Sequence, residues 1–315
     1  MRGATLGAMS VRSPYPIGTP GTPWGVTERE AWRARWRKQR SYADDVLAPV
    51  DALRASFDVS THARLDTGAD GTFPLIAIRT RGWDERLPTM LVTGGVHGYE
   101  TSGVHGALAL LARHGRDFAG RANVIVAPCV SPWAYERIQR WNPDAIDPNR
   151  SFGGSGLAPE SAALIALVAP LRGSILVHVD LHETTDTDES EFRPALAARD
   201  GKPFEPGTIP DGFYLVDDTE HPQPAFQAAV IEAVAKVTHI AAADPDGTMI
   251  GSLVVAPGVI RYPLRELGLC TSITGARFTT TTEVYPDSPR TTPAQCIDAQ
   301  VVAARAAIEL AISQR

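Results

Sequence analysis

The sequence predicts an α/β fold in which a mixed, mainly parallel, twisted sheet carries helices on both faces. From Thr89 onward, short apolar runs alternate with segments of helical pattern. The apolar runs have hydrophobic residues at successive positions, so their strands are expected to be buried on both faces, as in parallel sheets. Strands separated by helices favour parallel pairing, because a parallel crossover needs about a dozen residues or more.

The segment ahead of this alternation predicts an arm and two helices. Residues 1–23 are rich in Gly, Pro and Ser, which predicts an irregular arm. Thr27 and Glu30 form a capping-box pattern that opens a helix ending at Gln39. A second helix is expected over residues 42–56.

A hairpin and the alternating elements follow. Residues 57–66 and 73–81 carry β-favouring residues on either side of the turn-forming residues 67–71, which indicates a hairpin. Residues 184–222 are rich in Pro, Gly and acidic residues and are expected to run over the surface. The remaining strands are expected at residues 90–96, 123–130, 175–181, 240–243 and 272–284, and the helices at residues 104–114, 159–171, 225–237 and 293–312.

The composition excludes several classes of protein. A formal charge of −6 disfavours a nucleic-acid binder, because such proteins neutralise phosphates with clustered Lys and Arg. The one dense basic run, residues 33–40, is interpreted as a solvated helix face. No stretch approaches the roughly 18 apolar residues of a membrane span, and the N-terminus has no apolar core of a signal peptide. The odd number of cysteines, Cys129, Cys270 and Cys296, fits a reducing cytoplasm.

Candidate metal ligands stand directly after two of the expected strands. In open α/β sheets, ligands bind beyond the carboxyl ends of the strands. One strand leads into Gly-Gly-Val-His-Gly-Tyr-Glu, which places His97 and Glu100 about one helical turn apart. Another ends in Asp-Leu-His and delivers His182 to the same edge. His178 is the rival on that strand, and we interpret it as a buried histidine because His182 lies nearer the strand's end.

Two imidazoles and one carboxylate are the donors by which a catalytic zinc keeps a fourth position open, whereas structural zinc is closed by four protein ligands. The sequence therefore predicts one Zn²⁺ held by His97, Glu100 and His182.

A third motif lies between these two sites. Arg140, Asn142, Asp147, Asn149 and Arg150 form the pattern RxN(x4)DxNR. An HxxE, this pattern and a strand ending in DLH, in that order, resemble the zinc carboxypeptidase superfamily, whose other branch contains aspartoacylase and succinylglutamate desuccinylase. The resemblance covers roughly residues 89–286. It implies the zinc carboxypeptidase-like phosphorylase/hydrolase fold.

The resemblance also implies roles for the arginines. Arg140 would polarise the scissile carbonyl, and Asn149 with Arg150 would bind the terminal carboxylate of the substrate. A guanidinium suits both tasks, because its planar fork matches a carboxylate and stays charged at any working pH. The alternative is that Arg140 and Arg150 form structural ion pairs with Asp144 or Asp147.

The general base of that family lies near the end of a late strand, and Thr-Thr-Thr-Thr-Glu-Val-Tyr-Pro resembles this element. The resemblance assigns Glu283 as the base that accepts a proton from the attacking water. Glu183 and Glu266 are its competitors. Glu183 also departs from the family, which often has a small hydroxyl residue after the third ligand.

The substrate-capping tyrosine of the family corresponds to Tyr262 by its separation from Glu283, with Arg261, Arg265 or no residue as alternatives. The expected function is that of a metallocarboxypeptidase in one catalytic domain over residues 24–315. Its substrate would be a peptide or acyl-amino acid with a free carboxylate. The alternatives are an N-acyl amino acid deacylase and a catalytically inactive zinc-binding homologue.

An acidic run follows His182 and suggests two interpretations. It could attract a cationic substrate, or it could be a solvated loop, which we favour. Its members are Glu183, Asp186, Asp188, Glu189 and Glu191.

Overall fold

A computed structural model describes residues 15–153 and 158–314 of the protein. The expected N-terminal arm is therefore described only from residue 15, and over residues 15–23 it forms bends and a turn without helix or strand. Residues 1–14 of the arm lie outside the described part. None of the described helices is long and apolar enough to cross a membrane.

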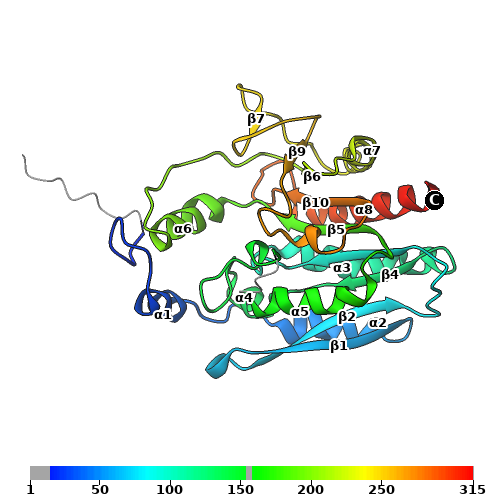
Figure 1. Ribbon diagram of the computed structural model, residues 1–315, viewed down its shortest axis with the longest axis horizontal. Helices are drawn as coiled ribbons and strands as arrows, with labels where there is room; N and C mark the ends of the chain where they lie inside the picture. Colours follow the sequence, from blue (N-terminus) through cyan, green and yellow to red (C-terminus); the bar gives the residue numbers. More distant parts are fainter. Residues whose placement is uncertain (1–14, 154–157, 315) are drawn as a thin grey trace, which may run out of the picture.

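Within the described residues, eight strands form one sheet in the order β1-β2-β4-β3-β5-β10-β6-β9 (Figure 1). The central strands β4, β3, β5 and β10 run parallel to one another, and β9 is parallel to β6, whereas β1–β2, β2–β4 and β10–β6 are antiparallel pairs. This confirms the predicted mixed, mainly parallel sheet. The bounds are β1 Phe57–Asp66, β2 Thr72–Thr80, β3 Thr89–Gly94, β4 Asn123–Ala127, β5 Ile175–Glu183, β6 Tyr214–Asp218, β9 Val259–Tyr262 and β10 Phe278–Val284, with a separate ribbon of β7 Thr248–Met249 and β8 Ser252–Leu253.

Helices cover both faces of the sheet because successive side chains of each strand point to opposite faces. Met90 and Val92 of β3 belong to the core under α3 and α8, whereas Leu91 packs with Leu164 of α5 on the other face. Figure 1 shows α5 on one face and α3 and α8 on the other. The bounds are α1 Val26–Arg35, α2 Ala48–Leu53, α3 Thr101–His114, α4 Pro132–Arg137, α5 Pro159–Val168, α6 Arg193–Arg199, α7 Pro224–Val234 and α8 Pro293–Ser313.

Several of the expected element boundaries are wrong. The first helix begins one residue earlier, because the carboxylate of Glu28 rather than that of Glu30 accepts a hydrogen bond from the flanking backbone, the N–H of Gly25. It also ends at Arg35 instead of Gln39. The strand expected over residues 240–243 is reduced to an isolated bridge, and the strand expected from residue 272 begins at Phe278 after a short 3₁₀ turn.

The expectation that residues 184–222 form a surface excursion is also wrong. This segment contains α6 and β6, and β6 lies inside the sheet between β10 and β9. Its apolar run Phe213–Val216 is buried. The run is short and stands among Pro, Gly and acidic residues. The composition of the whole segment therefore did not predict a strand.

A buried carboxyl on α5 makes stability depend on pH. Glu160 is 3% exposed, and burial raises its pKa from 4.5 to about 7. The folded protein then binds this proton more tightly than the unfolded chain does. The free energy of unfolding therefore falls as the pH rises from about 4.5 to about 7.

Glu160→Gln removes this titration. Its stability relative to the wild-type protein is expected to rise by up to about 3 kcal/mol between about pH 4 and about pH 8. Urea unfolding of both proteins at the two pH values measures this change. A difference in stability that stays constant with pH would contradict the prediction.

Candidate metal centre and active site

The three predicted metal ligands come together at the carboxyl ends of β3 and β5. His97 follows β3, Glu100 is the N-cap of α3, and His182 lies near the end of β5. Nδ1 of His97 is 2.7 Å from Oε1 of Glu100, and Nδ1 of His182 is 2.7 Å from Oε2 of the same carboxylate. The two Nδ1 atoms are 3.2 Å apart. All three side chains are buried, and one donor atom from each lies within 4.8 Å of the others.

The donor types and the spacing of the two imidazole nitrogens suit a small tetrahedral cation. Zinc–nitrogen bonds of about 2.0–2.1 Å place tetrahedral donors roughly 3.3 Å apart, close to the separation of the two imidazole nitrogens. Burial alone would raise the pKa of Glu100, but His182 and His97 lower it to about 2, so this donor is anionic.

Carboxylates occupy the outer nitrogens of both imidazoles. Nε2 of His97 is 3.1 Å from Oδ1 of Asp147, and Nε2 of His182 is 2.7 Å from Oδ2 of Asp180. Such partners favour a proton on Nε2 and leave the lone pair of Nδ1 facing the other donors. The donor set, its charge and its outer partners therefore fit a zinc ion.

Close backbone approach brings the ligand-bearing elements together. A Cβ on Gly103 of α3 would lie 2.3 Å from the carbonyl oxygen of Leu181 on β5, so only glycine permits this contact. A Cβ on Gly98, between His97 and Glu100, would lie 2.1 Å from the backbone of α4. The small residues of the first ligand motif thus serve packing.

Gly103→Ala is expected to push α3 away from β5 and so to separate Glu100 from His182. We expect a loss of about 1–3 kcal/mol in stability and a loss of about 10- to 100-fold in zinc affinity, as for changes in groups that position metal ligands. Thermal unfolding and competition with a chelator measure the two effects. Gly153→Ala is the control, because its Cβ would meet its nearest neighbour at 3.6 Å. Unchanged zinc affinity in Gly103→Ala would contradict the prediction.

The two competitors of Glu283 differ in position, since Glu183 lines the same pocket as Glu283 and Glu266 does not. Glu183 accepts hydrogen bonds from the backbone N–H groups of Thr101 and Ser102 at 3.0 and 2.7 Å, and so binds the first turn of α3. This position explains the departure from the family's small hydroxyl residue, because the carboxylate ties β5 to the helix that carries Glu100. Glu266 is exposed and does not line the pocket described below.

His178 is buried deeper in the sheet, as interpreted from the sequence, and is not part of the ligand group. Its Nε2 lies 3.1 Å from Oγ1 of Thr93. Burial lowers its pKa to about 4, so the ring is neutral.

Arg140 is fixed by several partners at once. Its Nε donates to Oδ2 of Asp147 at 3.1 Å, one η nitrogen donates to the hydroxyl of Tyr99 at 3.1 Å, and Asp188 lies 3.5 Å away. The ion pair with Asp147 that the sequence offered as an alternative is therefore present. It does not remove Arg140 from the site, because the same guanidinium lines the pocket.

Asn149 and Arg150 have different surroundings. Oδ1 of Asn149 accepts from the backbone N–H of Cys270 at 2.8 Å, and its Nδ2 lies 3.4 Å from Nε2 of His182. Arg150 is exposed within the pocket and donates to the carbonyl of Asn149. Among the described residues, no carboxylate lies within ion-pair distance of Arg150, so its charge is available to a ligand.

Glu283 and Tyr262 also reach this pocket. Glu283 of β10 is the register partner of His182 on the adjacent parallel strand, so both side chains point to the same face. Its Oε2 accepts from the hydroxyl of Thr184 at 3.0 Å, and that hydroxyl is 2.7 Å from the hydroxyl of Tyr214. Burial raises the pKa of Glu283 to about 8.

The acidic run after His182 is not simply a solvated loop, and its attraction of a cationic substrate stays a prediction. Asp188 accepts from the hydroxyl of Tyr99 at 2.8 Å and from the N–H of Thr185 at 2.8 Å. Glu189 pairs with Arg193, and Glu191 accepts from the hydroxyl of Tyr15. Most of these acids thus bind groups of the protein itself.

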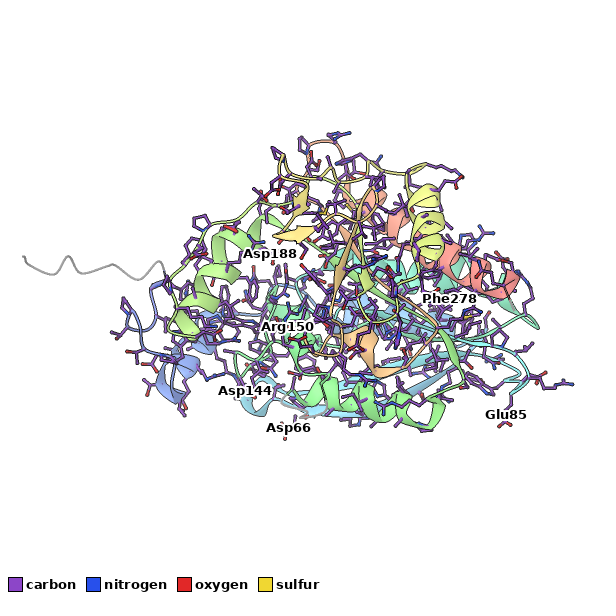
Figure 2. All side chains as sticks on the ribbon, turned by 45° about the horizontal axis from the view of Figure 1, so that its top comes forward. Asp66, Glu85, Asp144, Arg150, Asp188 and Phe278 are labelled. Atoms are coloured by element: carbon purple, nitrogen blue, oxygen red, sulfur yellow. The ribbon has the colours of Figure 1, made fainter. Side chains whose placement is uncertain are left out.

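The pocket mentioned above has a volume of about 210 Å³. In Figure 2, Arg150 and Asp188 lie near the middle of the view, and Glu85, which precedes β3, lies near its right-hand edge. The pocket is lined by His97, Arg140, Asn149, Arg150, Glu183, Thr184, Asp188, Phe192, Arg193, Tyr214, Val216, Ile250, Tyr262, Leu269, Thr281 and Glu283. Sequence reasoning missed Thr184, Asp188 and Tyr214 as site residues, since it assigned all three to a surface segment.

Comparison with known proteins gives a likeness in structure alone. No family model matches the chain, and a search of curated proteins by sequence finds no match. A candidate metallopeptidase from Shewanella amazonensis superposes with a TM-score of 0.62 at 20% identity, covering 85% of this chain and 91% of that one. A metallo-carboxypeptidase from Burkholderia cenocepacia gives 0.57 at 14% identity, over 93% and 70% of the two chains. The carboxypeptidase A from Helicoverpa armigera gives 0.55 at 12% identity, over 93% and 74%. The protein therefore has the fold of the zinc carboxypeptidase superfamily.

Proposed function

We propose that the protein is a zinc-dependent carboxypeptidase that hydrolyses the C-terminal amide bond of a peptide, in one catalytic domain over residues 24–315. The observation that carries the proposal is a buried His-Glu-His group whose His97 lines one pocket together with Glu283, Arg140 and Arg150. Structural neighbours that are described as a metallo-carboxypeptidase and as a carboxypeptidase A support it.

His97, Glu100 and His182 would hold the zinc ion, which would supply Lewis-acid chemistry toward carbonyl and water oxygens. Glu283 acts as general base and acid. The hydroxyl of Thr184 donates to one of its oxygens, and the carboxylate form, which predominates above the pKa of about 8, can accept a proton from the attacking water and return it to the leaving nitrogen.

The two arginines bind different parts of the substrate. Asp147 and Asp188 hold the guanidinium of Arg140, which donates to the scissile carbonyl and stabilises the charge that develops on its oxygen. Arg150, without a carboxylate partner in the described structure, binds the free carboxylate of the substrate. Tyr262 closes the same pocket.

Metal analysis combined with a substrate panel tests the proposal. The purified protein should contain one zinc ion and should release the last residue of peptides with a free C-terminus. N-acyl amino acids without a peptide bond belong in the same panel, because the same groups suit a deacylase. Cleavage of these alone would replace the carboxypeptidase by the deacylase, and a zinc-loaded protein that cleaves neither class would be a binding homologue.

A cytoplasmic location belongs to the same proposal. Cys129, Cys270 and Cys296 are buried and free, which suits a reducing compartment. Fractionation of the native cell followed by detection of the protein tests the location.

A further inference from the structure

A second cavity of about 270 Å³ adjoins the active-site pocket. We call it the aromatic pocket, and it is lined by Trp32, Trp36, Gln39, Tyr99, Ile138, Gln139, Arg140, Trp141, Thr187, Glu191, Phe192 and Ala195. It shares Arg140 and Phe192 with the active-site pocket. The guanidinium of Arg140 lies 4.2 Å from the centre of the Phe192 ring. This pair therefore forms the boundary between the two spaces.

Aromatic side chains hold one another in place around this cavity. The ring of Trp32 lies 6.0 Å from that of Trp36 and 5.5 Å from that of Trp141. Trp141 in turn meets Phe192 edge-on at 5.5 Å. Trp32 and Trp141 are almost fully buried. Walls that are already packed lose little side-chain freedom when a ligand binds, which favours affinity.

The basic run of residues 33–40 serves this arrangement, so its interpretation as a solvated helix face is wrong in part. Arg33 pairs with Asp70 at 2.7 Å. Arg40 donates to the hydroxyl of Thr101 and to the carbonyl of Gly98. Arg33 thus attaches α1 to the turn between β1 and β2, and Arg40 attaches the residues after α1 to the segment that carries His97 and Glu100.

The rim of the cavity includes a strained, exposed apolar residue. Ile138 ends α4 with φ of 55° and ψ of 55° and is 37% exposed. A β-branched residue in the left-handed region is uncommon and costs of order 1–3 kcal/mol. It stands two residues before Arg140, and its strain is typical of functional sites.

The charges of the aromatic pocket are already satisfied. Its charged members are Arg140 and Glu191. Arg140 pairs with Asp147 and Asp188, and Glu191 accepts from the hydroxyl of Tyr15. The remaining surface is mainly apolar, and its volume exceeds the roughly 150 Å³ of a cavity that admits a benzene ring. These properties suit a large uncharged ring.

The residues that line each pocket also indicate which side of the scissile amide the aromatic pocket would bind. Asn149, Arg150 and Glu283 line the active-site pocket but not the aromatic pocket, whereas Arg140 lines both. Under the proposed function, Arg150 binds the carboxylate of the leaving residue and Arg140 the scissile carbonyl. We propose that the aromatic pocket binds a large apolar, preferably aromatic, group on the acyl side of the scissile amide. This inference rests on the proposed function.

A matched series of substrates tests it. Acetyl, benzoyl and naphthoyl derivatives of one dipeptide differ only on the acyl side. Burying a large aromatic group contributes roughly 1.5–3 kcal/mol, so kcat/KM should rise about 10- to 150-fold from acetyl to naphthoyl. Trp36→Ala should remove most of this preference and leave the acetyl substrate within about twofold of wild type.

Two further variants keep the test independent of folding defects. Thr187→Phe fills the rim from an exposed position and should also abolish the preference. Trp83→Ala removes a partly buried tryptophan elsewhere in the core and should preserve it. Calorimetric titration of zinc-free protein with 2-naphthamide should show binding in wild type and Trp83→Ala and a loss in Trp36→Ala.

The outcomes separate the two proposals. Equal rates for the three acyl groups in wild type would overturn the aromatic pocket as a subsite and leave the carboxypeptidase intact. A preference that survives both Trp36→Ala and Thr187→Phe would also overturn it. Failure to cleave any member of the series would overturn the proposed function, and with it the acyl-side assignment.

Discussion

Glu283→Gln is expected to lower kcat by about 10²- to 10⁴-fold while the protein keeps its zinc. The amide retains the shape of the side chain and an oxygen for the hydroxyl of Thr184, but it cannot take a proton from water. Steady-state kinetics and metal analysis of the same preparation measure both quantities.

Glu266→Gln is the matched control, because Glu266 is exposed and outside the pocket. It should leave kcat and zinc content unchanged. Near-normal turnover in Glu283→Gln would show that another group accepts the proton, and a parallel loss of zinc would show that Glu283 is needed for the metal site.

Arg150→Ala is expected to lower kcat/KM about 30- to 1,000-fold, which corresponds to the loss of about 2–4 kcal/mol of charge-assisted hydrogen bonding to the substrate carboxylate. Arg150→Lys should recover part of this loss, since an ammonium keeps the charge but lacks the planar fork. The measurement compares a peptide with a free C-terminus and the same peptide amidated.

The amidated peptide decides the assignment. It lacks the carboxylate, so wild type and Arg150→Ala should cleave it equally slowly. Arg290→Ala, which changes an exposed arginine in a weak ion pair, should behave as wild type on both peptides. An equal loss on both peptides in Arg150→Ala would assign Arg150 a structural role instead.

The metal ligands could be predicted from the sequence because they belong to two short sequence patterns. His97 and Glu100 are three residues apart, and His182 stands at the end of an apolar run. The rule that parallel strands present their carboxyl ends at one edge of the sheet then joins the two halves. Arg140, Asn149 and Arg150 came from a resemblance in spacing, which the structure places around one pocket.

The other side chains of the site depend on packing that no local pattern shows. Tyr214 reaches Thr184 only because β6 inserts between β10 and β9. Asp188 is held by Tyr99 and Arg140, which are far from it in the chain. The aromatic pocket lies between the end of α1 and the start of α6, so Trp36 and Phe192 line one cavity only in the folded protein.

The carboxylate of Glu183 and the contact of Gly103 with Leu181 join the helix of one metal ligand to the strand of another. These attachments involve protein groups alone. The protein itself therefore sets the distances between the metal-ligand atoms. A frame of this kind selects cations by radius and preferred geometry. Calcium, which needs six to eight oxygen donors at longer bonds, is a poor match for two imidazoles and one carboxylate, whereas such a donor set suits zinc or cobalt.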